Sequence, residues 1–231
     1  MDYVWILAAL AGGYLVGSLS FAVIVSRAMG LADPRSYGSG NPGATNVLRS
    51  GSKPAAILTL ALDALKGYLP VLAVLAFGPR VGLGENTAAF VGLAAFAGHL
   101  WPLFFRFQGG KGVATAAGAL LAINPWLGLA TLLTWIIIAA FFRYSSLASL
   151  VAAGFAPFYQ ALIWGIEPPL LAIGIMSVLL IWRHEGNIRK LLAGTESKLG
   201  QKAAPPGPLQ GVDRPHARHG HHPHKHPKGH H

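Results

Sequence analysis

The stretch Gly112–Phe142 is the feature that most restricts what this chain can fold into. It holds 31 residues without one charged side chain, in a chain of 231 residues that is 53% hydrophobic and only 11% charged. A soluble domain normally carries about 25% charged residues. A helix needs about 20 apolar residues to cross a bilayer, so this stretch is too long for one ordinary span and short for two. The pattern predicts an all-α integral membrane protein.

Further apolar stretches predict the remaining spans. We place them at residues 3–26, from Lys53 to about Phe77, and at about 86–105, 147–164 and 168–182. The first lacks the short core and cleavage pattern of a signal peptide, so we expect it to be retained as one span. Asn124-Pro125 divides the uncharged stretch, because this pair breaks helices and starts turns. The first half is short enough to be tilted or partly re-entrant.

The distribution of charge selects between six and seven spans. Seven transmembrane helices with the N-terminus outside collect on one face the basic residues Arg27, Arg35, Arg49, Lys53, Arg106, Lys111, Arg143, Arg183, Arg189 and Lys190. The other face receives only Arg80, Glu85 and Glu167. Six spans would divide the basic residues between the faces, against the positive-inside rule. We therefore predict seven spans and a cytoplasmic C-terminus, and the basic excess then needs no nucleic acid partner.

The chain divides into two regions by composition. Residues 1–202 form the predicted membrane-embedded domain. Residues 203–231 are rich in Pro, Gly and basic residues and hold eight of the ten histidines. Such a segment cannot bury a core and is predicted to be disordered. Binding of zinc, nickel or anionic lipid and an uncommitted soluble tail are both open interpretations.

Four polar stretches fall on the predicted cytoplasmic face: 39–49, 109–112, 143–146 and 183–198. The second, Gly-Gly-Lys-Gly, turns sharply and presents backbone N–H groups beside Lys111, which is suited to seat a phosphate. It is not a P-loop, because Lys111 is followed by Gly112. The alternative is a glycine-rich turn with a positive-inside lysine.

The other three stretches have structural alternatives too. The first is denser in Ser, Asn and Thr than a connecting loop needs, although an Asx turn before a short helix at 44–48 would explain part of it. Ser145 and Ser146 suit a helix N-cap, which is also an anion site. In the fourth, His184 and Asn187 lie one turn apart and could face one site. Its apolar residues at 188, 191, 192 and 195 have helical spacing, which predicts an amphipathic surface helix.

Three ionisable residues lie within predicted spans. Asp63 and Lys66 are one turn apart on one helix. Such groups are functional candidates by default, but mutual neutralisation that holds helices together explains this pair better. For His99 we favour a packed hydrogen-bonding role over catalysis.

These side chains suit phosphate chemistry. Arg, Lys, Ser, Asn and backbone N–H groups bind phosphate and stabilise developing negative charge. The face lacks the clustered carboxylates that metal-dependent phosphotransferases use, and the chain has no cysteine. No Gly-x-Ser-x-Gly elbow and no His-x₄-Asp pattern is present, so no acyl-enzyme is suggested. We predict no metal and no cofactor.

Together these stretches resemble the PlsY family, the bacterial acyl-phosphate:glycerol-3-phosphate acyltransferases, over about residues 3–200. The resemblance rests on the segments 38–46 with Arg49, 98–102, 107–115, 143–146, 184–196 and the pattern Asp63-x-x-Lys66-Gly67. The family implies transfer of an acyl group from acyl phosphate to the 1-hydroxyl of sn-glycerol 3-phosphate. The expected products are 1-acyl-glycerol 3-phosphate and phosphate, the first acylation of phospholipid synthesis.

The resemblance also implies roles for individual residues. The expected catalytic residues are Ser39, Lys111, His184 and Asn187. The expected substrate-binding residues are Asn41, Thr45, Arg49, Gly109, Gly110, Gly112, Ser145 and Ser146. The expected supporting residues are Asp63, Lys66 and Glu196. Arg49 and its neighbours would face glycerol 3-phosphate, and Lys111 with the glycine amides would hold the acyl phosphate. The proton acceptor is either His184 or a substrate phosphate.

The implied setting is the bacterial inner membrane, with an active site at the cytoplasmic face and the acyl chain in an apolar groove between helices. Membrane lipid is an expected partner, and a monomer is compatible with the sequence. A transporter of an organic phosphate and a non-catalytic lipid-binding scaffold are the alternatives. A transporter should place polar groups at the midplane and show internal repeats, which we do not find.

Overall fold

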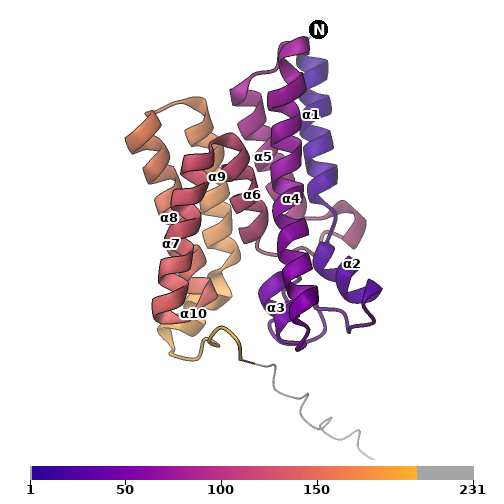
Figure 1. Ribbon diagram of the computed structural model, residues 1–231, viewed down its shortest axis with the longest axis vertical. Helices are drawn as coiled ribbons and strands as arrows, with labels where there is room; N and C mark the ends of the chain where they lie inside the picture. The colour runs from indigo at the N-terminus through magenta and orange to yellow at the C-terminus, as the bar shows by residue number, and fades with distance from the viewer. Residues whose placement is uncertain (1, 202–231) are drawn as a thin grey trace, which may run out of the picture.

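A computed structural model describes residues 2–201, so the predicted tail lies outside the described residues. Over these residues the regular secondary structure is entirely helical. The elements are α1 (Asp2–Gly17), α2 (Phe21–Ala28), α3 (Ala44–Leu48), α4 (Lys53–Phe77), η1 (Gly78–Val81), α5 (Glu85–Leu100), η2 (Leu103–Phe105), α6 (Val113–Ile123), α7 (Pro125–Phe142), α8 (Ser145–Trp164), α9 (Pro168–Arg183) and α10 (Glu185–Leu192). The start of α1 lies at one end of the bundle and α10 at the other (Figure 1).

The helices form two groups with α6 between them. α1, α4 and α5 stand on one side and α7, α8 and α9 on the other (Figure 1). Small residues let α6 approach α4 closely: a Cβ added to Gly67 would overlap the Thr115 carbonyl, and one added to Gly118 would overlap the Ala64 carbonyl. Such glycine contacts are the usual basis of tight helix packing in membranes.

Several predicted boundaries are confirmed. The predicted second span coincides with α4, which begins at Lys53 after the side chain of Ser52 caps the Ala55 N–H. The predicted break in the uncharged stretch occurs at Asn124, whose Oδ1 accepts the N–H groups of Trp126 at 3.0 Å and Leu127 at 3.2 Å. The break therefore follows from a local side-chain cap and a proline, both visible in the sequence.

The predicted first span, residues 3–26, is not one continuous helix. The chain forms α1 and α2, which are bent by 41° at Ser18–Ser20. Ser18 Oγ donates to the Tyr14 carbonyl at 2.8 Å, a contact that competes with helix continuation. The carbonyl of Leu19 accepts a hydrogen bond from Lys66 Nζ at 2.7 Å. Lys66 thus supplies a donor to a backbone carbonyl at the break, where the apolar surroundings would otherwise leave it unpaired.

The Asp63–Lys66 pair is buried, as its predicted neutralising role requires. Lys66 Nζ lies 2.8 Å from Asp63 Oδ1, and both side chains are almost fully buried in α4. His99 Nδ1 on α5 lies 3.7 Å from the same carboxylate and 3.2 Å from Thr115 Oγ1 on α6. The pair therefore ties α4 to the break between α1 and α2, and lies beside a polar contact between α5 and α6.

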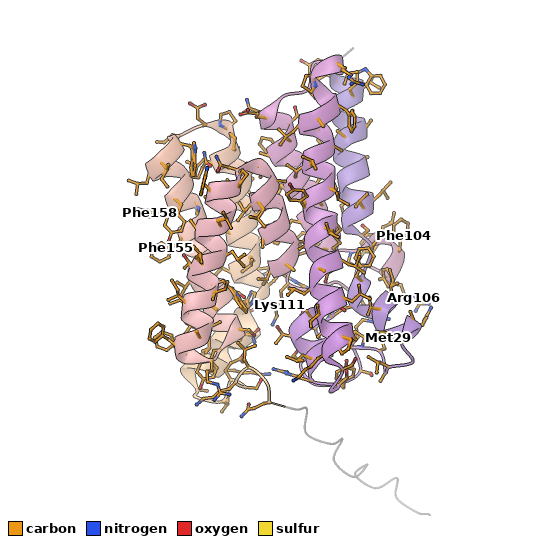
Figure 2. All side chains as sticks on the ribbon, viewed as in Figure 1. Met29, Phe104, Arg106, Lys111, Phe155 and Phe158 are labelled. Carbon is orange, nitrogen blue, oxygen red and sulfur yellow. The ribbon has the colours of Figure 1, made fainter. Side chains whose placement is uncertain are left out.

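The outer surface of the bundle is strongly apolar. Four helices of residues 2–201 are long and apolar enough to cross a membrane, and the bent pair of α1 and α2 is a fifth candidate span, while α6 and α9 are shorter apolar helices. Large side chains such as Trp126 and Phe141 are exposed on α7. Phe155 and Phe158 point away from the bundle on α8 (Figure 2). A surface of this kind is suited to lipid contact.

Candidate active site

A cavity of about 590 Å³ lies between the two groups of helices, and its lining residues are polar in one part and apolar in the other. Its polar part contains twelve residues that the sequence singled out: Ser39, Asn41, Thr45, Arg49, Asp63, Lys111, Gly112, Ser145, Ser146, His184, Asn187 and Glu196. Lys111 lies between the two groups in Figure 2. The four polar stretches therefore meet at one place.

A hydrogen-bonded chain joins three of these stretches. Lys111 Nζ donates to Asn187 Oδ1. Asn187 Nδ2 donates to Glu196 Oε1 at 2.7 Å, and Ser146 Oγ donates to the same oxygen at 2.7 Å. Glu196 thus fixes the orientation of the Asn187 amide. In this orientation Asn187 Oδ1 faces the ammonium group of Lys111. This arrangement supports the expectation that Glu196 orients its neighbours.

The first polar stretch is shaped by Asn46, which sequence reasoning did not select. Asn46 is buried, and its Oδ1 accepts the Ser39 N–H at 3.0 Å. Its Nδ2 donates to the carbonyls of Pro34 at 2.6 Å and Tyr37 at 3.1 Å. One amide side chain therefore folds the loop that presents Ser39 to the cavity. The density of Asn in this stretch was the available signal.

Arg49 follows the short helix α3, as its predicted position requires. Its Nη2 donates to Ser197 Oγ, in the segment just after Glu196. This contact holds the guanidinium group at the cavity, where Arg49 is a lining residue, and it uses only one of the group's nitrogen atoms. A guanidinium in this position suits bidentate binding of a phosphate.

Helix N-termini add to the positive potential of the cavity. Gly112, Val113 and Ala114 at the start of α6 line it, as do Ser145 and Ser146 at the start of α8. Neither helix has a side-chain cap. Their first N–H groups and dipoles therefore favour an anion in the cavity.

His184 and Lys111 have altered proton affinities because they are buried. His184 connects α9 to α10, and its Nδ1 donates to the Leu180 carbonyl at 2.8 Å, which leaves Nε2 as the acceptor in the neutral ring. Burial lowers the pKa of His184 to about 4, with Lys111 and Arg183 also disfavouring its charge. Burial lowers the pKa of Lys111 to about 8, although Glu196 favours its charged form.

The structure does not bring Gly109 and Gly110 to the cavity, although both were expected to bind substrate. The Gly110 N–H donates to the His99 carbonyl at 3.1 Å. The Gly109 carbonyl accepts from Arg183 Nη2 at 2.9 Å, and the Gly110 carbonyl accepts from Nη2 at 3.1 Å and Nε at 3.2 Å. These glycines instead let the turn pack against its neighbours, since a Cβ on either would overlap His99. Gly112 alone of the three lines the cavity.

Arg183 is a residue of the site that sequence reasoning missed. It was counted as a basic residue of the cytoplasmic face and as the first residue of the fourth polar stretch, with no role of its own. In the structure its three hydrogen bonds hold the glycine turn from the end of α9, next to His184 in the chain. Its position directly before a predicted site histidine was the only sequence signal.

The described residues, 2–201, contain no group of three or more His, Asp or Glu side chains placed to hold a metal ion. The polar part of the cavity offers cations, amide donors and hydroxyl groups in their place. Glu196 and Asp63 are the carboxylates of the lining, and both are engaged by hydrogen bonds or an ion pair. The site can therefore hold an anion next to the apolar part of the cavity.

Comparisons with known proteins identify what this site is similar to. A family model described as glycerol-3-phosphate acyltransferase matches residues 7–194. A glycerol-3-phosphate acyltransferase of Ralstonia nicotianae is 67% identical over 192 residues, which cover 83% of this chain and 93% of the relative. That of Paraburkholderia phytofirmans is 66% identical over 189 residues, covering 82% and 88%.

Two solved structures are also similar. A crystal structure of PlsY (YgiH), an integral membrane glycerol 3-phosphate acyltransferase in its glycerol 3-phosphate form, is 39% identical with a TM-score of 0.78 and covers 84% of this chain and 96% of that chain. The lysophosphatidic acid form of PlsY has a TM-score of 0.75 at 38% identity, covering 84% and 94%.

Proposed function

The chain belongs to the glycerol-3-phosphate acyltransferase family, and we propose that its acyl donor is an acyl phosphate and its product a 1-acyl-sn-glycerol 3-phosphate. The family membership makes it an integral membrane acyltransferase, as its motifs predicted. The observation that carries the finer proposal is the cavity itself. It combines cations and uncapped helix N-termini with an apolar channel, which suits an acyl chain attached to a phosphate.

The two substrates are assigned to adjoining parts of the polar region. Lys111, Ser145, Ser146 and the Gly112 amide hold the acyl phosphate, with the acyl chain in the apolar channel. Ser39, Asn41, Thr45 and Arg49 hold glycerol 3-phosphate together with His184 and Asn187. The hydrogen bond from Lys111 to Asn187 joins these two sets, so the two phosphates lie close to shared positive charge.

The reaction is direct transfer without a covalent enzyme intermediate. The glycerol 1-hydroxyl attacks the acyl carbonyl carbon, and the bond between that carbon and the phosphate oxygen breaks. Phosphate leaves, and Lys111 with the helix N-termini stabilises its charge and that of the tetrahedral intermediate. Acyl phosphate is a mixed anhydride and needs no further activation. The phosphate-binding groups therefore provide catalysis as well as affinity.

The low pKa of His184 favours a substrate phosphate over this residue as the proton acceptor. With a pKa of about 4, its Nε2 is a weak base at neutral pH. A phosphate monoester dianion has a second pKa of about 6 and is the stronger base. We assign the proton to a substrate phosphate. His184 acts by accepting a hydrogen bond from the attacking hydroxyl and orienting it.

The function is tested by phosphate release from palmitoyl phosphate and glycerol 3-phosphate by protein purified in detergent. Acyl-CoA and acyl-carrier-protein donors release no phosphate, so they are assayed in parallel by formation of 1-acylglycerol 3-phosphate, with chelator present. Release that requires both substrates, with acyl phosphate as the only donor, supports the proposal. Turnover with acyl-CoA at an equal or higher rate would overturn the donor assignment.

Site variants make the test specific. We expect Lys111→Ala and Arg49→Ala to abolish turnover and leave folding intact. Arg80→Ala is the matched control, because Arg80 lies on η1 at the other end of α4 from the cavity-lining residue Lys53. Activity of either site variant at the level of the control would refute the assignment.

We further propose seven spans with the N-terminus outside and the active site at the cytoplasmic face of the bacterial inner membrane, with residues 1–202 as the membrane domain. The absence of cysteine from the chain makes this easy to test. A membrane-impermeant maleimide should label Arg80→Cys in intact spheroplasts and Lys198→Cys only after permeabilisation. The opposite pattern would reverse the orientation, and labelling of both would indicate an even number of spans between them.

A further inference from the structure

Beyond the residues of the four polar stretches the cavity has a mainly apolar part, here called the channel, with small side chains along two helices. Ala116 and Ala117 on α6 line it, as do Ala152, Ala153 and Ala156 on α8. Alanines at helical spacing on facing helices leave room between them that larger residues would fill. The channel therefore has space for a linear apolar group along its length.

The channel is accessible from the side near its polar end. Ile57 and Leu60 on α4 line the cavity, and both are exposed on the surface of the bundle. Both lie within the first third of α4, close to Lys53, which also lines the cavity. A lipid chain can therefore enter from the bilayer side at this level.

The deep end of the channel is closed. Leu120, Ala156 and Ile173 line it there and are only 4%, 2% and 1% exposed. Leu127 belongs to the same buried cluster but does not line the cavity, so it packs behind this end. A chain that reaches these residues can go no further.

The distance between the two ends corresponds to an acyl chain of medium to long length. From Ser146 to Ala156, α8 advances about 15 Å at roughly 1.5 Å per residue. From His184 to Ile173, α9 advances about 16 Å by the same measure. An extended hydrocarbon advances about 1.25 Å per bond, given C–C bonds of about 1.5 Å. The channel then holds about 12 to 14 carbon atoms.

We propose that Ala156, together with Leu120 and Ile173, sets the length of the acyl chain that the enzyme accepts from its donor. This inference rests on the proposed acyl phosphate donor. Ala156 is the residue at which a larger side chain shortens the channel, because it has the smallest side chain at the closed end. Leu120 is the residue at which a smaller side chain extends it.

The expected size of the effect follows from the burial of methylene groups. Each methylene that loses its place in an apolar site changes affinity about fourfold. Ala156→Leu adds three carbon atoms at the closed end and should displace about two methylenes. We therefore expect kcat/KM for tetradecanoyl and hexadecanoyl phosphate to fall about 15-fold, while that for octanoyl phosphate stays within about twofold.

The experiment measures kcat/KM for acyl phosphates of 8 to 18 carbons at constant detergent. Parent protein, Ala156→Leu, Leu120→Ala and the control Ala161→Leu are compared, since Ala161 is exposed on α8. The preferred length should shift to shorter chains in Ala156→Leu and to longer chains in Leu120→Ala, and stay unchanged in the control. Turnover of octanoyl phosphate shows that each variant is folded and active.

Each outcome decides the proposal. An equal loss at all chain lengths in Ala156→Leu, or an unchanged preference in Leu120→Ala, overturns it. Where Ala156→Leu gives no folded protein, Leu120→Ala decides by itself, because it only removes atoms. Failure of the parent protein to use any acyl phosphate would instead refute the proposed function, and is thus distinguishable.

Discussion

Replacement of Arg183 by lysine should lower activity without unfolding the protein. Arg183 makes three hydrogen bonds of 2.9–3.2 Å to the carbonyls of Gly109 and Gly110, directly before Lys111. A lysine keeps the charge but cannot reach both carbonyls with a planar fork. The variant loses the equivalent of at least one bond to a charged group, worth about 1.5–3 kcal/mol. The turn then no longer fixes Lys111 against Asn187.

We expect the lost hydrogen bonding to lower kcat/KM and to leave the stability of the fold nearly unchanged. If it is expressed in the transition state, kcat/KM falls about 10- to 100-fold, since 1.4 kcal/mol is about tenfold. The assay is phosphate release under saturating acyl phosphate with varied glycerol 3-phosphate, which separates kcat from KM. Thermal unfolding in detergent should change little, because Arg183 is only partly buried. Millimolar guanidinium should partly restore the activity of Arg183→Ala.

A surface arginine serves as the control. Arg189 on α10 pairs with Glu185, and both side chains are exposed. Such pairs contribute at most about 1 kcal/mol, so Arg189→Lys should leave kcat/KM within about twofold. Full activity of Arg183→Lys would refute the positioning role. A matched loss of activity and of thermal stability would show that Arg183 only maintains the fold.

Three further outcomes follow from individual groups. Activity should decline as pH rises through about 8, where Lys111 loses its charge, and Lys111→Arg should move this decline to higher pH in a rate profile. Gly112→Ala should lower the free energy of unfolding by about 2–5 kcal/mol, because φ of Gly112 is +82° and an added Cβ would overlap core side chains. Gly154→Ala is the control and should be neutral or slightly stabilising in thermal unfolding, because an added Cβ on α8 would meet no atom there. Asp63→Asn should destabilise the protein by about 3–5 kcal/mol by removing the charge that neutralises the buried Lys66, and the double variant with Lys66→Met should recover part of this loss.

The parts of the fold that the sequence predicted well are those set by local signals. Lys53 and Pro54 mark the start of α4, and Asn124 caps α7 through contacts two and three residues away. The lengths of the apolar stretches, together with such capping and proline residues, locate most helices. The meeting of four polar stretches at one cavity was also predictable, because the predicted topology placed them on one face.

The parts that could not be predicted depend on contacts far apart in the chain. The break at Ser18–Ser20 contains no glycine, proline or charged residue. Its Leu19 carbonyl accepts a hydrogen bond from Lys66, which lies 47 positions later in the chain. The glycine turn is a similar case. Its sequence permits its N–H groups to face the cavity or its carbonyls to bind a cation outside it, and Arg183, 73 to 74 positions later, binds the carbonyls.

The contacts of the glycine turn are the reason why we place the proposed phosphate site at the helix starts and not in that turn. The carbonyls of Gly109 and Gly110 are turned to Arg183, so these residues cannot surround an anion. The N–H groups at the starts of α6 and α8 have no side-chain cap, in contrast to α7, where Asn124 provides one. The first N–H groups of a helix have no partner within the helix and need one outside it. In the proposed complex a substrate phosphate is this partner, so that substrate binding completes the hydrogen bonding at the two helix starts.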